Sequence, residues 1–519
     1  MYPGRHAVQA PDRPALIMAE SGDVTTYGQF EAVANQMAHL FRNSGLRHRD
    51  HIALLIENDP ALLTASAGAE RTGLVYTPIS HHLSSEQIAY VVNDCRAELV
   101  VVSAKTLPLA LNLPQMCPKV NRWVVANSDA AELPHPFEAL DSALEGEPST
   151  PVSDERLGVA MLYSSGTSGR PKGIYRPFPD VAPGIETGRM AFAQKLFRMR
   201  PGMVYLSPAP LYHSAPQSAV SSCIRMGATA VIMQRFDAAE FLRAIERYGV
   251  THTQVVPTMF SRLLALPDQQ RLDADLSSLE WVIHAAAPCP VPLKEQMIDW
   301  LGPIIAEYYS STEANGATTC DSLEWIAHKG TVGRAILGEV CILDDKRAPC
   351  PPGAIGEIWF RGATKFEYFG DPDKTAASRD PSGEMSTVGD VGYLDSDGYL
   401  FLTDRMSMMI ISGGVNVYPQ ETENVLMMHP SVEDVAVIGV PHPDLGEEVR
   451  GVVQVRNGVI ESADLAAELV DYCRSRLSHI ACPRSIDFDR ELPRSPTGKL
   501  LKRQVRQRYW PLDRSAQDG

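Results

Sequence analysis

The amino-acid sequence predicts the α/β fold class, with a large N-terminal domain built on parallel sheets and a smaller C-terminal domain. At 519 residues the chain exceeds the size of one ordinary hydrophobic core. Strand signals alternate with amphipathic helix signals over most of its length, which is typical of parallel sheets covered by helices. A turn-rich stretch near residue 400 then separates a final region of about 110 residues, which is enough for a small domain.

Residues 236–257, with the sequence FDAAEFLRAIERYGVTHTQVVP, illustrate the alternation. Asp237 is a suitable N-cap, and Gly249 is expected to end the helix before an apolar strand at 254–256. In such folds ligands bind at the carboxyl ends of the strands, so the residues just after strands are the candidates for chemistry. Further strands are predicted at 99–102, 281–284 and 304–308.

The C-terminal region follows the turn-forming sequence DSDG at 395–398. Beyond it, a strand is predicted at 435–439 and a helix with one apolar face at 463–477. We therefore divide the chain into domains 1–404 and 405–519.

Composition excludes several function classes. There are 47 Lys and Arg against 63 Asp and Glu, a net charge of −16, which disfavours nucleic acid as a partner. The first residues lack the apolar segment of a secretory signal, and no stretch approaches the roughly 18 apolar residues of a membrane span. Nine scattered cysteines without a C-x-x-C pair favour reduced thiols. We expect a cytoplasmic protein with no transmembrane segment.

A glycine-rich stretch, YSSGTSGRPKG at 163–173, follows a predicted strand. Glycines let backbone N–H groups approach an anion, hydroxyls add donors, and Lys172 supplies positive charge, so the stretch is a candidate phosphate cradle. It does not match the Walker A spacing, because Arg-Pro separates Gly169 from the lysine. A flexible linker or a plain surface loop is the alternative.

Three further segments carry candidate residues. EYYSSTE at 307–313 closes a strand with aromatic rings, hydroxyls and Glu313, which can hold Mg²⁺, although a polar turn with a capping Glu has the same composition. Asp390 is able to accept ribose hydroxyls, although a lone Asp in a glycine-rich turn is often a turn former. PRSPTGK at 493–499 presents Lys499 on a rigid turn rather than on a helix face.

Together these segments resemble the adenylate-forming superfamily of acyl-CoA synthetases, adenylation domains and beetle luciferases. The resemblance covers nearly the whole chain, in the family's order. Its motifs here are YSSGTSGRPKG (163–173), LYHSAP (211–216), HAAAPCP (284–290), EYYSSTE (307–313), GEIWFRG (356–362), VGDVGYLDSDGY (388–399), DRMSMMIISGGVNVYPQETE (404–423) and PRSPTGK (493–499).

The resemblance implies ATP, Mg²⁺ and coenzyme A as the small molecules bound. The reaction it implies is attack of an acid's carboxylate on the α-phosphate of ATP, followed by capture of the acyl-AMP by a thiol. The glycine loop and Lys172 would hold the β- and γ-phosphates, Thr312 would contact the α-phosphate, Glu313 would bind Mg²⁺, and Lys499 would stabilise the transition state. Further ATP- or AMP-binding residues would be Ser165, Gly166, Thr167, Ser168, Gly169, Ala287, Pro288, Glu307, Tyr308, Tyr309, Asp390 and Arg405.

The resemblance also implies that the small α+β C-terminal domain is mobile. It would rotate about a hinge at Arg405 and Ser407, withdrawing Lys499 and bringing a CoA-binding segment, Ser412, Gly413 and Gly414, to the site. Many relatives carry a charged residue where this chain has Ser407. This departure puts charge-based switching at the hinge in question.

Within the family, the sequence favours a fatty or aryl acyl-CoA synthetase acting on an apolar carboxylic acid, whether fatty, aryl or bulky polycyclic. Amino-acid-activating members place an aspartate near LYHSAP, whereas this chain has a tyrosine and a histidine there. His213 is either a gating residue or a hydrogen-bonded structural histidine. The candidate acyl pocket comprises Tyr212, His213, Thr258, Met259, His284 and Ala285.

Three alternatives stay open at this point. The acceptor is CoA or, alternatively, a separate acyl carrier protein, and the second step could be oxidative as in luciferases. A nucleotide-binding scaffold without activity is disfavoured, because the candidate charged residues are all present. The sequence does not reveal whether the chain forms a homo-oligomer.

Overall fold

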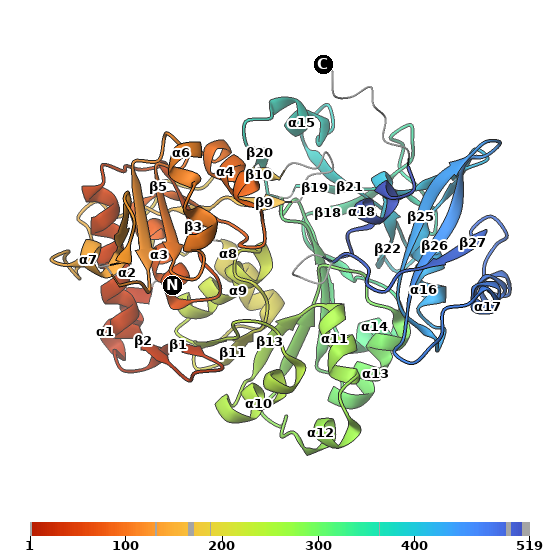
Figure 1. Cartoon of the computed structure of the whole chain (residues 1–519), viewed down its shortest axis with the longest axis horizontal. Helices are drawn as coiled ribbons and strands as arrows, with labels where there is room; N and C mark the ends of the chain where they lie inside the picture. Colours follow the sequence, from red (N-terminus) through yellow and green to blue (C-terminus); the bar gives the residue numbers. More distant parts are fainter. Residues whose placement is uncertain are drawn as a thin grey trace.

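The computed structural model describes residues 3–129, 132–164, 171–186, 188–362, 364–494 and 500–510. Two sheets covered by helices make up the N-terminal and middle parts of the chain, and the last strands and helices form a separate group at one end of the molecule (Figure 1). The predicted α/β class, with a large N-terminal and a small C-terminal domain, is confirmed.

The central sheet of the large domain has the strand order β17-β16-β15-β14-β13-β11-β12-β1-β2. Neighbouring strands from β15 to β1 are parallel, whereas β2, β16 and β17 add antiparallel edges. The strands are β1 (Pro14–Met18), β2 (Val24–Thr26), β11 (Val204–Ser207), β12 (Thr229–Ile232), β13 (His252–Val255), β14 (Trp281–His284), β15 (Ile305–Ser310), β16 (Ala317–Cys320) and β17 (Arg334–Leu337).

A second sheet, nearer the N-terminus, is parallel throughout its described strands, in the order β7-β6-β5-β3-β4-β8. Helices α2 (Tyr27–Asn43), α3 (Pro60–Thr72) and α9 (Ser214–Arg225) share one apolar core with strands of both sheets. The strands are β3 (His51–Leu55), β4 (Val75–Pro78), β5 (Leu99–Ser103), β6 (Arg122–Ala126), β7 (Phe137–Ala139) and β8 (Val159–Ala160).

Helix α10 (Ala238–Tyr248) forms as its sequence predicts. The Asp237 side chain accepts a hydrogen bond from the Glu240 N–H at 2.9 Å, and Gly249 ends the helix in the left-handed conformation with φ 60°. The other described helices of the large domain are α1 (Pro3–Gln9), α4 (Ser85–Asp94), α5 (Leu107–Ala110), α6 (Leu113–Met116), α7 (Leu140–Leu144), α8 (Gly188–Phe197), α11 (Pro257–Leu264), α12 (Asp268–Asp273), α13 (Val291–Leu301), α14 (Ser322–Ala327) and α15 (Pro372–Ala377).

Two smaller antiparallel sheets complete the large domain. One has the order β20-β10-β9 and the other β18-β19-β21-β22. They bring segments that are far apart in sequence next to the central sheet. Their strands are β9 (Leu162–Ser164), β10 (Lys172–Tyr175), β18 (Glu339–Leu343), β19 (Gly356–Arg361), β20 (Glu367–Tyr368), β21 (Met385–Leu394) and β22 (Leu400–Arg405).

The C-terminal part has its own sheet, β24-β23-β26-β25 with β27 beside β26, and its own apolar core. The predicted helix at 463–477 is α17, which ends at Arg474 and buries Leu465, Leu469 and Cys473. Its elements are a 3₁₀ turn η2 (Met406–Met408), β23 (Ile410–Ser412), β24 (Val415–Val417), α16 (Pro419–Leu426), β25 (Val432–His442), β26 (Gly446–Val455), α17 (Ala463–Arg474), β27 (Ser485–Phe488) and α18 (Lys502–Gln507).

All nine cysteines are free thiols. Among the described residues, no helix has both the length and the apolar character needed to cross a bilayer.

Candidate active site

The candidate active site lies at the carboxyl ends of the parallel strands of the central sheet. β11, β13, β14 and β15 are neighbours and run in the same direction. The order of the strands reverses at β11, with β12 on one side and β13 on the other, and such a switch point opens a crevice for a ligand. The loops after these strands carry the predicted acyl residues, the predicted adenine residues and the residues Thr312 and Glu313. The fold therefore gathers them at one edge of the sheet.

The strands that flank the glycine-rich stretch pair with each other. β9 and β10 are antiparallel, with Ser164 opposite Lys172. The predicted phosphate-binding residues 165–169 lie outside the described residues. The Lys172 side chain is 20% exposed, and its Nζ lies 3.6 Å from Asp371 Oδ2. A partly exposed cation therefore stands beside this stretch.

Tyr309 and Asp390, both predicted nucleotide residues, are bonded to each other. The Tyr309 hydroxyl donates to Asp390 Oδ2 at 2.7 Å, and the Tyr309 ring stacks on Phe360 with centroids 6.2 Å apart. Asp390 is buried in β21, opposite Arg405 in β22, whose side chain lies outside the described part of the chain. The structure thus brings together the pair predicted to hold the ribose, with the predicted stacking ring beside it.

Glu313, the predicted Mg²⁺ ligand, lies in the turn after β15 and is only 8% exposed. Its Oε1 accepts a hydrogen bond of 2.9 Å from the Tyr368 hydroxyl, and Thr312 beside it is half-buried. Within the described residues, no lysine or arginine comes within ion-pair distance of Glu313. After the turn, Gly316 has no room for a side chain, because a Cβ there would lie 2.0 Å from the Phe360 ring.

The two loops that border the nucleotide side each hold an alanine in the left-handed region. Ala286, after β14, has φ 75°, and Ala314, after Glu313, has φ 53°. This conformation costs a non-glycine residue roughly 1–2 kcal/mol, and such strain often occurs at functional sites. The predicted adenine residues Ala287 and Pro288 follow the first of these strained positions directly.

The predicted residues Glu307 and Tyr308 point to opposite faces of β15. Glu307 is buried, and its Oε2 lies 2.6 Å from Lys294 Nζ and 3.4 Å from His284 Nε2. Burial raises the pKa of Glu307, against the pull of Lys294. On the other face, the Tyr308 hydroxyl accepts a hydrogen bond from Gln254 Nε2 at 2.7 Å. The Glu307 carboxylate is therefore already paired with Lys294 on one face of β15.

Aromatic and imidazole rings cluster on the acyl side. The rings of Tyr212 and His213, which follow β11, lie 4.4 Å apart. His81 and His82, on the loop after β4, extend the cluster, with the His81 ring 5.7 Å from Tyr212. His213 Nε2 and His81 Nδ1 are buried and have no hydrogen-bond partner among the described residues.

The predicted acyl residues carry no charge near neutral pH. Burial lowers the pKa of His213 to about 4, and burial with the nearby Lys294 holds the pKa of His284 well below its ordinary value. Burial also raises the pKa of Tyr212 to about 12. Met259 and Ala285 are buried, and Thr258 is half-buried at the start of α11.

The predicted CoA-binding segment forms a tight hairpin. Ser412 pairs with Val415, and Gly413 and Gly414 between them have φ 58° and 80°. A two-residue turn with both φ values positive favours glycine, so the fold alone gives a reason for this pair.

The predicted hinge and catalytic lysine fall partly outside the described part of the chain. This applies to Lys499 and to the side chains of Arg405 and Ser407. Before the hinge, Asp404 Oδ2 accepts a hydrogen bond of 3.1 Å from the Gln420 N–H and lies 3.7 Å from Lys502 Nζ. The residue that precedes the hinge is therefore attached to the C-terminal part.

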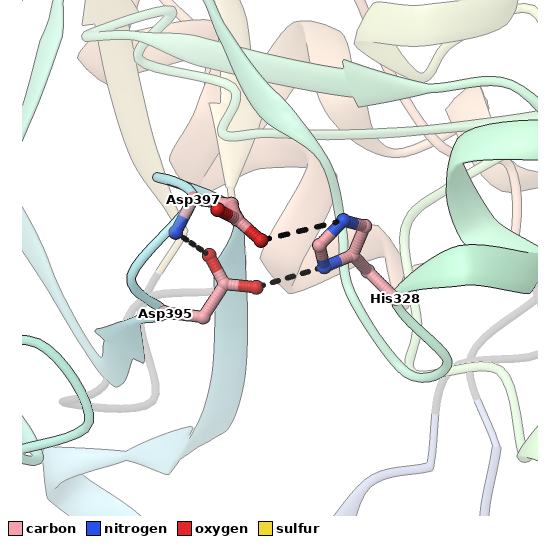
Figure 2. A group of neighbouring side chains, drawn as sticks. All are labelled: His328, Asp395 and Asp397. Carbon is pink, nitrogen blue, oxygen red and sulfur yellow. Dashed lines mark hydrogen bonds and ion pairs between the residues drawn. The ribbon is translucent and has the colours of Figure 1, made fainter.

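Another acidic group, away from these residues, joins the predicted turn at 395–398 to the end of α14. His328 lies between two carboxylates, with Nδ1 2.9 Å from Asp395 Oδ2 and Nε2 4.0 Å from Asp397 Oδ2 (Figure 2). One ligand atom from each lies within 4.8 Å of the others. Because the two carboxylates face different ring nitrogens and Asp395 Oδ1 also closes its own turn, these contacts fasten two loops together.

Sequence reasoning did not identify several partners of the site. Tyr368, Asp371 and Lys374 belong to a segment about 200 positions after Lys172, and β20 beside β10 brings them close. The only local signal is the Asp371-Pro372 start of α15, which indicates a helix cap and nothing more. His81, His82 and Lys294 were missed for the same reason, because they come close only through sheet packing.

Most of the chain matches two known protein families. Residues 4–368 match the family described as AMP-binding enzyme, and residues 421–499 match the AMP-binding enzyme C-terminal domain.

Several curated proteins are similar over nearly their full length. A feruloyl-CoA synthase of Amycolatopsis sp is 31% identical over 98% of both chains, and the long-chain-fatty-acid–CoA ligase FadD13 of Mycobacterium tuberculosis is 30% identical over 97% of both. The fatty acid–acyl-carrier-protein ligase ScoC of Streptomyces coeruleorubidus is 29% identical over 97% of this chain and 95% of its own. Different acids and different thiol acceptors therefore occur among the relatives.

Solved structures share the fold across both domains. A Mycobacterium tuberculosis fatty acyl CoA synthetase has a TM-score of 0.72 and 26% identity, covering 98% of this chain and 97% of its own. ATP-bound MatB of Rhodopseudomonas palustris has a TM-score of 0.82 and 25% identity, covering 98% of this chain and 99% of its own.

Proposed function

The chain belongs to the AMP-binding enzyme family and is an AMP-forming acyl-CoA synthetase, and we propose that it acts on an apolar carboxylic acid, whether fatty, aryl or bulky polycyclic. ATP and CoA are its co-substrates. The acid carboxylate attacks the α-phosphate of ATP to give acyl-AMP and pyrophosphate, and the CoA thiol then displaces AMP to give the thioester.

The observation that carries the proposed substrate class is the neutrality of the acyl side. His213 and His284 are uncharged because of their low pKa values, and Tyr212 is protonated. None of the six proposed acyl residues carries a charge that would neutralise an ammonium group or a second carboxylate of a substrate. Burying an unpaired charge there would be costly, so the pocket favours an acid whose remaining part is apolar.

On the nucleotide side, we propose that Tyr309 stacks on adenine, that Ala287 and Pro288 flank it, and that Asp390 and Arg405 hold the ribose. Glu307 and Tyr308 contribute from the same strand. Such a role for Glu307 goes through its backbone, since its carboxylate pairs with Lys294.

At the phosphates, Lys172 and the glycine stretch at 165–169 hold the β- and γ-phosphates, and Thr312 contacts the α-phosphate. Glu313 fits a divalent cation, because it is a buried carboxylate with no ion pair among the described residues. A bound Mg²⁺ would supply neutralisation of phosphate charge. Lys499 completes the proposed site by stabilising the charge that develops during attack on the α-phosphate.

For the second step, we propose that the domain 405–519 rotates relative to 1–404 about Arg405 and Ser407, bringing Ser412, Gly413 and Gly414 to the thiol path. The last strand of the large domain, β22, ends at Arg405, so the change from one sheet to the next falls within one residue of the proposed boundary. The nine free cysteines are compatible with the cytoplasmic location that we propose.

An acyl carrier protein is the alternative acceptor, because the carrier-protein ligase ScoC is similar over nearly the whole chain. The test measures AMP and thioester formation with a panel of fatty, aryl, polycyclic and amino acids, each with CoA or with a phosphopantetheinylated carrier protein. We expect CoA-dependent turnover with apolar acids and none with amino acids. Turnover only with the carrier protein, or preference for a zwitterionic acid, would overturn the proposal.

A further inference from the structure

Lys172 has a second lysine beside it, and the fold explains why. β10 starts at Lys172 and pairs with β20, where Ile174 lies opposite Tyr368. Helix α15, which carries Lys374, follows β20 directly, and a hydrogen bond of 3.0 Å from the Tyr368 N–H to Thr375 Oγ1 fixes the helix against the strand. The two lysines therefore face the same region from different segments.

Asp371 connects the two lysines. Its Oδ2 pairs with Lys172 Nζ at 3.6 Å, while its Oδ1 accepts a hydrogen bond of 3.0 Å from the backbone N–H of Lys374. Lys374 Nζ itself lies 4.1 Å from the centroid of the Tyr368 ring. The hydroxyl of that ring donates to Glu313, so the ammonium group stands above the residue that positions the proposed Mg²⁺ ligand.

The Lys374 side chain has no ion pair within the described residues, although it is half-buried. Burial and the neighbouring Lys172 lower the pKa of Lys374 to about 8, despite the opposing charges of Glu313 and Asp371. The two ammonium groups repel each other, and Asp371 forms an ion pair with only one of them, Lys172. A polyanion between them would turn the repulsion into attraction.

We propose that Lys374 is a second phosphate-binding residue, which contacts the β- or γ-phosphate oxygens of ATP beside Lys172 and holds the departing pyrophosphate. This inference rests on the proposed nucleotide site. The ligand is a di- or triphosphate chain, because Lys172, Lys374 and the Mg²⁺ held at Glu313 would together match an anion with several negative charges.

The test compares Lys374→Met, which keeps an unbranched apolar side chain on the Tyr368 ring but removes the charge, with Lys374→Arg, which keeps the charge. Lys346→Met, an exposed lysine in the turn after β18, is the matched control, and Lys172→Met is the positive control. The measurements are KM for ATP, the inhibition constant of added inorganic pyrophosphate in acyl-AMP formation, and the rate of thioester formation from supplied acyl-AMP.

For Lys374→Met we expect the pyrophosphate inhibition constant and KM for ATP to rise roughly tenfold, the loss expected for one charge-assisted hydrogen bond. Lys374→Arg should restore most of this, and thioester formation from acyl-AMP should stay unchanged. If Lys172→Met raises the inhibition constant but Lys374→Met does not, this inference is wrong and the nucleotide site stands.

If neither variant moves the inhibition constant, the proposed nucleotide site itself fails. A purely structural role would lower both half-reactions and the melting temperature together, and Lys374→Arg would not rescue them. That outcome also overturns the inference.

Discussion

The two sides of the site are built differently. On the nucleotide side Asp390, Glu313 and Lys172 each already have a partner: Tyr309 bonds Asp390, Tyr368 bonds Glu313, and Asp371 pairs with Lys172. On the acyl side His213 Nε2 and His81 Nδ1 are buried without hydrogen bonds from described residues. Phosphate chemistry needs charges fixed in advance, whereas recognition of the acid is left to neutral surface.

The largest expected effect comes from breaking the buried ion pair between Lys294 and Glu307. Lys294→Met would leave the Glu307 carboxylate buried without its cation. We expect a loss of about 3–5 kcal/mol in the free energy of unfolding. Urea denaturation monitored by circular dichroism measures this change.

The matched variant is the double substitution Lys294→Met with Glu307→Gln. It removes both charges, so its loss should be clearly smaller than that of Lys294→Met alone. A double variant as unstable as the single one would mean that packing, rather than the ion pair, supports this part of the sheet edge.

Glu313→Gln is expected to damage the nucleotide side alone. The amide keeps the shape but loses the charge that would hold Mg²⁺, and we expect pyrophosphate release to fall by roughly 10²–10³-fold. Thermal unfolding should change little, and Tyr368→Phe, which removes one hydrogen bond to Glu313, should cost much less. Glu313→Gln with nearly full activity would contradict the assignment.

The buried histidines predict a pH dependence that separates stability from substrate recognition. Burial lowers the pKa of both His213 and His252 to about 4. Between pH 4 and 6.5 the unfolded chain binds protons that the folded chain does not. Stability therefore rises with pH across this window and falls as pH drops from 6.5 toward 4.

His213 and His252 make a matched pair, because His252 begins β13 at the opposite end of the strand from the site and bonds Thr251 Oγ1 at 2.7 Å. Changing either to Gln should lessen the acid-induced loss, by no more than about 3 kcal/mol each. Only His213→Gln should change KM for the acid. An equal change of KM in both variants would exclude a specific role for His213.

The smallest expected effect concerns the strained loop after β14. Ala286→Gly relieves a left-handed alanine, so the protein should be unchanged or stabilised by up to about 1 kcal/mol. Ala287→Gly, whose position has no positive φ, should instead destabilise slightly. Differential scanning calorimetry distinguishes the two, and equal destabilisation would show that Ala286 is not strained.

The sequence predicted the regular elements well, because their signals are local. The strand at 281–284 is β14, the Asp237 cap and the Gly249 stop define α10, and the turn at 395–398 is closed by Asp395. Strand ends differ by a few residues where pairing decides them, as for β25, which extends the predicted 435–439 to Val432–His442.

Site residues were predicted only where they lie within the family motifs. Asp390 and Arg405 were paired through the family resemblance, and the register of β21 with β22 places them opposite each other. The partners of these residues were out of reach, because contacts such as that of Tyr368 with Glu313 depend on which strands lie side by side. Neither the periodicity nor the composition of the sequence shows which strands become neighbours.

The central claim is that charged groups act on the phosphates in the first half-reaction, while the acyl side stays neutral in both. The most direct test is Lys499→Ala, assayed separately for acyl-AMP formation from acid and ATP and for thioester formation from supplied acyl-AMP and CoA. We expect the first rate to fall by roughly 10²–10³-fold while the second stays near that of the unmodified enzyme. Equal losses in both half-reactions would contradict it.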